Sequence, residues 1–182
     1  MKILVTSFKT FNNSLNNYSM EVLKYLNGVD KLIVDVNYDI CYQEIISNVD
    51  ISNYDYIIAM GEARMRDELM IESQALNISS CSIVDNSGVL KQNELIFINS
   101  PEVLKTQIDL GAFSSLVKIS NYAGKFVCNN LYYHLLHDYP LKSLFIHIPN
   151  CHDNEAEYVK HAETIMKIFN VLYSQKLVEG EI

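Results

Sequence analysis

The chain has 182 residues, of which 49% are hydrophobic and 20% charged, and its 14 basic and 22 acidic side chains give a formal net charge of −8. This is the balance of a globular protein, and the length suits one domain (residues 1–182) whose core needs no disulfide or structural metal. Because the surface is acidic and the basic residues are scattered, neither nucleic acid nor an anionic membrane is an expected partner.

The sequence also bears on the compartment. No apolar run approaches the length of a membrane span, and the first residues lack the long apolar stretch and the cleavage site of a signal peptide. We therefore expect a cytoplasmic protein with reduced thiols. No two cysteines form a Cys-x-x-Cys pair, which argues against a zinc ribbon or a thioredoxin-like site. The cysteines are Cys41, Cys81, Cys128 and Cys151.

From the N-terminus, apolar runs of strand length alternate with stretches of helical periodicity. Residues 2–6 form a compact β-branched run and predict the first strand. The rest of the first half predicts a helix at 17–27, a strand at 31–36, a helix at 42–49 and a strand at 56–60 that ends at Gly61.

The second half begins with less regular segments. Residues 69–78 fit either a strand or a helix, and residues 79–99, which contain an Asn-Ser-Gly turn, are expected to be irregular or to form a hairpin. The pattern then predicts a helix at 101–108, a strand at 115–119, a helix at 126–139, a strand at 144–148 and a helix at 154–175. This alternation predicts an α/β fold with a mostly parallel sheet, helices on both faces and a functional site at the carboxyl ends of strands.

Cys128 is the strongest candidate for a nucleophile. It follows the turn-forming Gly124 and lies close to the start of the helix predicted at 126–139. The free N–H groups and partial positive charge of a helix N-terminus lower the pKa of a thiol, which favours the reactive thiolate. The alternative is a small apolar residue packed inside the helix.

His147 and Glu72 are the candidate partners of this thiol. His147 lies at the end of the strand predicted at 144–148, at the same edge of the sheet as Cys128, and an imidazole can accept a thiol proton and later protonate a leaving amine. Glu72 is a lone carboxylate in an apolar run, where burial without a partner would be costly, so it is the candidate group that orients the imidazole. The alternatives are a core histidine bonded to a backbone carbonyl and an exposed glutamate.

Phe8 and Phe11 follow the first predicted strand, where they can form the walls of a small apolar pocket unless they are ordinary core residues. Cofactor sites have little support. His147, Cys151 and His152 lack helical metal-ligand spacing and an obvious fourth ligand, and no Gly-x-Gly-x-x-Gly sequence follows the first strand.

Four stretches, in order and across nearly the whole chain, carry a family resemblance. They are Lys2-Ile3-Leu4-Val5-Thr6-Ser7-Phe8 with Phe11; Gly61-Glu62-Ala63 through Arg66 to Glu72 and Asn77; Ala123-Gly124-Lys125-Phe126-Val127-Cys128-Asn129; and Phe145-Ile146-His147-Ile148-Pro149. Together they resemble the pyroglutamyl peptidase I (pyrrolidone-carboxylate peptidase) family, and the stretches around the cysteine and the histidine are the most specific.

The resemblance implies a single three-layer α/β/α sandwich with a Cys-His-Glu triad of Cys128, His147 and Glu72, and no cofactor. It implies a cytosolic cysteine peptidase, a dimer or tetramer, which removes the pyroglutamyl residue from peptides with this blocked N-terminus through a thioacyl intermediate. The residues that it places beside the substrate are Phe8, Phe11, Glu62 and Arg66.

The chain departs from the family pattern around the expected pocket. The family usually has glycine at Ser7, a Gly-Gly pair at Asn12-Asn13, and Gly-Gln-Ala-Gly-Gly-Arg where residues 61–66 read Gly-Glu-Ala-Arg-Met-Arg. Asparagine tolerates positive φ, so the second change is expected to be mild. Arg64 and Met65 remove a permissive backbone, and Glu62 brings a carboxylate. The alternative hypotheses are therefore a related amidohydrolase with another N-acyl or lactam specificity, and a non-catalytic peptide-binding descendant.

Overall fold

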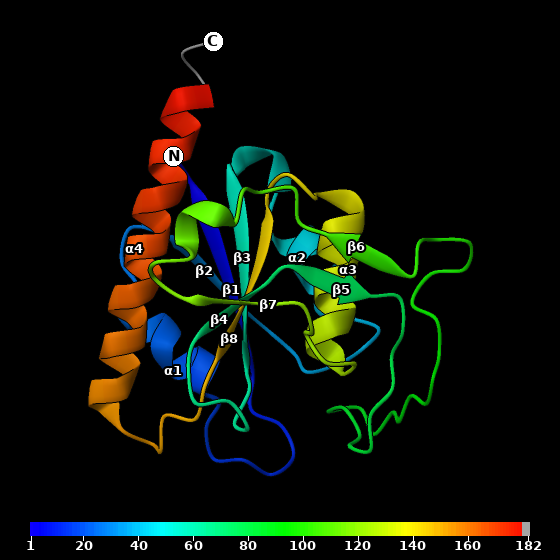
Figure 1. Cartoon of the computed structure of the whole chain (residues 1–182). Coiled ribbons are helices and arrows are strands. Elements are labelled where there is room, and N and C mark those ends of the chain that lie inside the picture. Colours follow the sequence, from blue (N-terminus) through cyan, green and yellow to red (C-terminus); the bar gives the residue numbers. More distant parts are fainter. Residues whose placement is uncertain (180–182) are drawn as a thin grey trace.

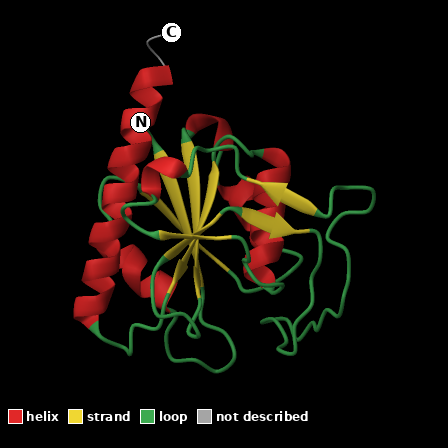
Figure 2. Cartoon of the chain, viewed as in Figure 1, coloured by secondary structure: helices red, strands yellow, loops and turns green. Residues whose placement is uncertain are grey.

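A mixed, six-stranded sheet forms the centre of the molecule (Figure 2), in a computed structural model that describes residues 1–179. Its strands are β1 (Ile3–Phe8), β2 (Asp30–Val34), β3 (Tyr56–Glu62), β4 (Met70–Glu72), β7 (Lys118–Ser120) and β8 (Ser143–Ile148). The strand order is β2-β1-β3-β8-β4-β7. The first four strands in this order are parallel, and β4 with β7 runs antiparallel to them. The predicted mostly parallel sheet is confirmed.

Helices cover both faces of this sheet (Figure 1). They are α1 (Tyr18–Tyr25), α2 (Cys41–Asn48), α3 (Val127–Asp138) and α4 (Glu155–Glu179). One apolar core joins the sheet to α1 and α4, and a second core joins it to α2 and α3. On β8, Ile146 belongs to the first core and Phe145 to the second, which is why this strand reads as a continuous apolar run. The three-layer α/β/α architecture is therefore confirmed.

The predicted helix at 101–108 is wrong. Val103–Lys105 forms strand β6, which pairs antiparallel with β5 (Gln74–Leu76) in a separate two-stranded sheet. The Asn77 side chain fixes the chain before β6, because its amide donates to the carbonyls of Phe97 and Ser100. This tertiary pairing outweighs the local helix signal. The segment at 69–78, for which the sequence fitted either a strand or a helix, contains the two short strands β4 and β5. Residues 79–99 are irregular, which is one of the two forms predicted for them.

The other elements lie near their predicted positions. The predicted strand at 115–119 is displaced towards the C-terminus and shortened to β7, because the N–H groups of Leu116 and Val117 bond back to the Phe113 carbonyl in a turn that follows the 3-10 turn at Gly111–Phe113. A second 3-10 turn lies at Ile51–Asn53. No helix within the described residues is long and apolar enough to cross a membrane.

The backbone explains how this chain accommodates the departures from the family pattern. Asn12 and Asn13 have φ values of 51° and 56°, so asparagine occupies the left-handed conformation, as predicted. Neither Arg64 nor Met65 has a positive φ, and the turn they form closes with a hydrogen bond from the Arg66 N–H to the carbonyl of residue 63 at 2.9 Å. The turn therefore does not need glycine in this chain.

Candidate active site

The sulfur of Cys128 lies against the backbone of a neighbouring strand. Cys128 is the second residue of α3 and is half-buried. A Cβ atom added at Gly61, on β3, would approach the Sγ atom to 2.7 Å and the Phe145 ring to 2.9 Å. Only glycine leaves this space. Gly61 is the register partner of His147 on β8, so the thiol lies over the strand position adjacent to the imidazole.

The imidazole is held by a carboxylate from the next strand of the sheet. The Nδ1 atom of His147 lies 2.7 Å from Oε1 of Glu72, and both side chains are buried. On the antiparallel pair of β8 and β4, His147 faces Met70, two positions from Glu72, so both side chains lie on the same face. A carboxylate only accepts, so Nδ1 carries the hydrogen and the other ring nitrogen, Nε2, is left as a base.

Arg66 supports this carboxylate. Its Nη1 atom donates to Oε1 of Glu72 at 2.5 Å, and its Nη2 atom donates to the carbonyl of Tyr122 at 2.7 Å. The Tyr132 hydroxyl donates to the backbone carbonyl of Glu72 at 2.8 Å. The structure thus places Arg66 on Glu72, and Arg66 does not line the pocket described below. The substrate contact expected of it stays a prediction.

The pKa of the Cys128 thiol differs from the value that its place at a helix N-terminus predicts. Burial raises the pKa of the Cys128 thiol to about 12, and the charges of Glu62 and Glu72 act in the same direction. The predicted lowering of this pKa is therefore wrong for the free protein, because desolvation outweighs the helix N-terminus. Burial also lowers the pKa of His147, so its imidazole is neutral at neutral pH. The resting pair is consequently a thiol and a neutral base.

Glu72 remains ionised although it is fully buried. Burial alone would raise the pKa of its carboxyl, but the hydrogen bond and charge of His147, with the cation of Arg66, hold that pKa below its ordinary value. An ionised Glu72 keeps the hydrogen of His147 on Nδ1 and would stabilise an imidazolium formed during a reaction.

A small, mostly apolar pocket opens beside the thiol. Its lining consists of Phe8, Phe11, Asn17, Val36, Glu62, Phe126, Val127 and Cys128. The rings of Phe11 and Phe126 lie 5.8 Å apart. The structure therefore brings Phe8, Phe11 and Glu62 together at the thiol, where the sequence predicted them.

Sequence reasoning missed several residues of this lining. Phe126 directly precedes the helix that carries Cys128, which was a usable signal. Asn17 caps α1, where its side chain accepts from the Ser19 N–H at 3.0 Å, and it stands at the start of a predicted helix. Val36 follows β2 and carries no sequence signal for a pocket, because only the packing of α3 brings it near Cys128.

The site combines a half-buried thiol at a helix N-terminus, a neutral imidazole oriented by a buried carboxylate, and an adjacent apolar pocket. These are the features of a cysteine hydrolase. The comparison with known proteins narrows this class. The pyroglutamyl peptidase family matches residues 1–168. The chain belongs to this family of cysteine peptidases.

Individual relatives agree with this assignment. The pyrrolidone-carboxylate peptidase of Thermosipho melanesiensis is 33% identical, with 86% of this chain and 87% of that protein covered. That of Fusobacterium nucleatum is 31% identical, with 81% and 78% covered. The crystal structure of pyrrolidone carboxyl peptidase from Fervidobacterium islandicum has the same fold, with a TM-score of 0.83 over 96% of this chain and 99% of that chain at 23% identity.

Proposed function

We propose that this protein is a cysteine peptidase that removes the N-terminal pyroglutamyl residue from peptides. The observation that carries the proposal is the position of the Cys128 sulfur, over Gly61 and beside the strand position of His147, at the mouth of a pocket walled by Phe8 and Phe11. Membership of the pyroglutamyl peptidase family supports it, as do the names of the relatives.

The pocket suits a flat, uncharged acyl group. A pyroglutamyl residue has no ammonium group, so its ring needs apolar walls and a few hydrogen bonds and does not need an ionic anchor. Phe8 and Phe11 would contact the faces of the lactam ring. Glu62 is not available as an ionic anchor for a substrate, because its carboxylate already accepts from the Arg64 guanidinium at 2.7 Å.

In the first half of the reaction, Nε2 of His147 accepts the proton of the Cys128 thiol as the sulfur attacks the amide carbonyl that follows the ring. The N–H groups at the start of α3 would stabilise the oxyanion of the tetrahedral intermediate. Glu72 stabilises the imidazolium. The imidazolium then protonates the departing amine, and the carbon–nitrogen bond breaks to leave a thioester on Cys128.

In the second half, His147 accepts a proton from water, and the oxygen attacks the thioester carbonyl. The thiolate leaves and regains its proton from the imidazolium, which releases pyroglutamate. A raised thiol pKa fits this scheme. The proton must leave Cys128 during the attack, so the reaction depends on the neutral imidazole at that moment.

Hydrolysis of a pyroglutamyl coumarin amide by recombinant protein tests the proposal. We expect turnover by the wild type and none by Cys128→Ala. Cys81→Ser is the matched control, because Cys81 is a partly exposed thiol that does not line the pocket. Absence of turnover by the pure wild type from mildly acid to mildly alkaline pH would refute the proposal.

We further propose that the substrates are short peptides with a blocked N-terminus, that the protein acts in the cytosol, and that it forms a homodimer or homotetramer. The acidic net charge of −8 supports a soluble peptide as the substrate and not nucleic acid or an anionic membrane. Light scattering of the purified protein measures the oligomeric state.

A further inference from the structure

Glu62 does more in this structure than line the pocket. Its side chain is only 3% exposed, although it lies at the end of β3 next to the thiol pocket. Its Oε2 atom accepts the backbone N–H of Tyr18 at 2.8 Å, at the first residue of α1. A carboxylate at this place satisfies a helix N-terminal donor and interacts favourably with the helix dipole.

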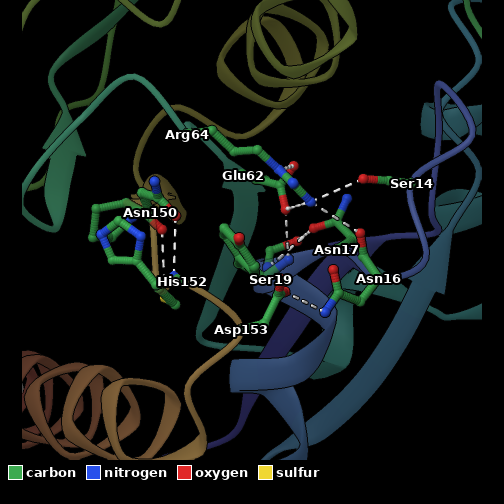
Figure 3. A network of polar contacts seen from close by, with 12 residues as sticks. Ser14, Asn16, Asn17, Ser19, Glu62, Arg64, Asn150, His152 and Asp153 are labelled. Atoms are coloured by element: carbon green, nitrogen blue, oxygen red, sulfur yellow. Dashed lines mark hydrogen bonds and ion pairs between the residues drawn. The ribbon is translucent and has the colours of Figure 1, made fainter.

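Arg64 links this carboxylate to the loop before α1. Its Nε atom donates to Oε1 of Glu62 at 2.7 Å, and its Nη2 atom donates to the Ser14 hydroxyl at 2.9 Å and to the Asn16 carbonyl at 3.3 Å (Figure 3). The guanidinium also lies 4.5 Å from the centre of the Tyr18 ring. We call the set of Ser14, Asn16, Glu62 and Arg64 the clasp.

A second contact fixes the same loop from another direction. The Asn16 side chain donates to Oδ1 of Asp153 at 2.7 Å, in the turn between β8 and α4. The backbone N–H of Asn150 donates to the Arg66 carbonyl at 3.1 Å, which joins that turn to residues 63–66. The loop at residues 9–17 is therefore held between the ends of β3 and β8.

The position of this loop decides the shape of the pocket. Phe11 lies in the loop and Asn17 ends it, and both line the pocket with Glu62. The triad has separate support, because Arg66 holds Glu72 and Glu72 holds His147. A change in the clasp should therefore alter the binding of the acyl ring more than the chemistry at the thiol.

We propose that Glu62 and Arg64 are positioning residues that hold the loop at residues 9–17, and with it Phe11, over the pocket, and so determine how tightly the acyl ring is bound. This proposal rests on the proposed function for its substrate. It gives a role to Glu62 and Arg64, two of the three positions at which residues 61–66 depart from the family pattern.

A double-mutant cycle with Arg64→Gln and Glu62→Gln tests the proposal on pyroglutamyl coumarin amide. We expect each single variant to raise KM about tenfold with kcat within about twofold of the wild type. The two residues share one ion pair, although Glu62 also accepts from the Tyr18 N–H and Arg64 also donates to Ser14 and Asn16. The double variant should therefore be less impaired than the two single effects combined would predict. Arg64→Lys, which keeps the charge but loses the planar fork, should show a smaller rise in KM. If Arg64→Gln does not fold, Arg64→Lys provides the comparison.

Amide hydrogen exchange gives a readout that does not depend on catalysis. In Arg64→Gln the amides of residues 9–17 should exchange at least about tenfold faster, while those of α3 should not change. The matched control is Lys118→Gln, because Lys118 forms an exposed ion pair with Glu68 that contacts neither the loop nor the pocket. Its kinetics and exchange should equal those of the wild type.

Three outcomes would overturn the proposal. A rise in KM for Glu62→Gln but not for Arg64→Gln would mean that Glu62 contacts the ring directly. A fall in kcat at unchanged KM would place the clasp in the chemistry, and additive effects in the double variant would show that the two residues act separately. If the wild type does not cleave the amide at all, the proposed function fails, and hydrogen exchange alone then decides whether the clasp holds the loop.

Discussion

The sulfur of Cys128 contacts the backbone of Gly61, so closely that the methyl group of an alanine at position 61 would lie 2.7 Å from it. Gly61 is in turn the register partner of His147. A missing side chain on β3 thus allows the first turn of α3 to approach the sheet, and this approach sets the thiol over the strand position next to His147.

Replacement of Gly61 by alanine should move the sulfur away from the imidazole. The added methyl group would also meet the fully buried Phe145 ring at 2.9 Å, so the Cys128 side chain, which borders the pocket, would have to shift. We expect kcat/KM to fall by about 100-fold and the free energy of unfolding to fall by about 1–3 kcal/mol. Gly111→Ala is the control, because its methyl group would meet only the Asp109 side chain, at 3.2 Å. Wild-type activity in Gly61→Ala would contradict the assigned position of the thiol.

Iodoacetamide at neutral pH should alkylate Cys128 faster than the other three thiols. Cys128 is half-buried, lines the pocket and lies over the strand position next to His147, which can accept its proton, whereas Cys41 and Cys151 are buried away from the reagent. In His147→Gln the Cys128 thiol loses its base, so its alkylation should slow by at least about tenfold. Peptide mass spectrometry of timed samples measures all four thiols, with Cys81 as the internal reference. Equal rates at Cys128 in the two proteins would argue against the thiol–imidazole pair.

The pH dependence of kcat/KM should report the ionisation of the His147 imidazole. Burial holds the pKa of His147 below its ordinary value, so kcat/KM should decline only at a pH more acid than the ordinary titration range of an imidazole, where the base becomes protonated. Glu72 opposes this shift, so Glu72→Gln should move the acid limb to still lower pH and reduce kcat by about 10²–10⁴-fold. An acid limb that moves to higher pH in Glu72→Gln would contradict the assignment.

Loss of Arg66 should destabilise the fold through Glu72. Arg66→Gln leaves a fully buried carboxylate without its cation, and we expect the free energy of unfolding at pH 7 to fall by about 3 kcal/mol. The pKa of Glu72 is lowered in the folded protein, so its contribution to stability is present above its unfolded pKa and lost as the pH falls through the folded value. The difference between variant and wild type should therefore shrink below about pH 4.

Denaturant unfolding at several pH values measures this difference. Lys160→Gln is the control, because Lys160 forms an exposed ion pair with Glu157, and it should leave the midpoint unchanged at every pH. An equal loss of stability in Arg66→Gln at neutral and acid pH would show that the ion pair with Glu72 is not the cause.

The residues of the candidate triad could be predicted from the sequence because each stands at a recognisable place. Cys128 follows a turn and opens a helix, and His147 ends an apolar strand, so the parallel sheet brings both to one edge. Glu72 stood out as a carboxylate in an apolar run. The predicted helix at 101–108 failed, because the pairing of β6 with β5 depends on residues about 30 positions away in the chain.

The sequence by itself determined the α/β order of this protein and the placement of the thiol, imidazole and carboxylate at one sheet edge, and it allowed a positive φ at Asn12 and Asn13. These features follow from local preferences and from strand direction. Only the tertiary structure decided that the Cys128 thiol is protonated at rest and that Arg64 binds Glu62. Desolvation and ion pairs depend on which side chains meet after the chain has folded, and the order of residues does not give those distances.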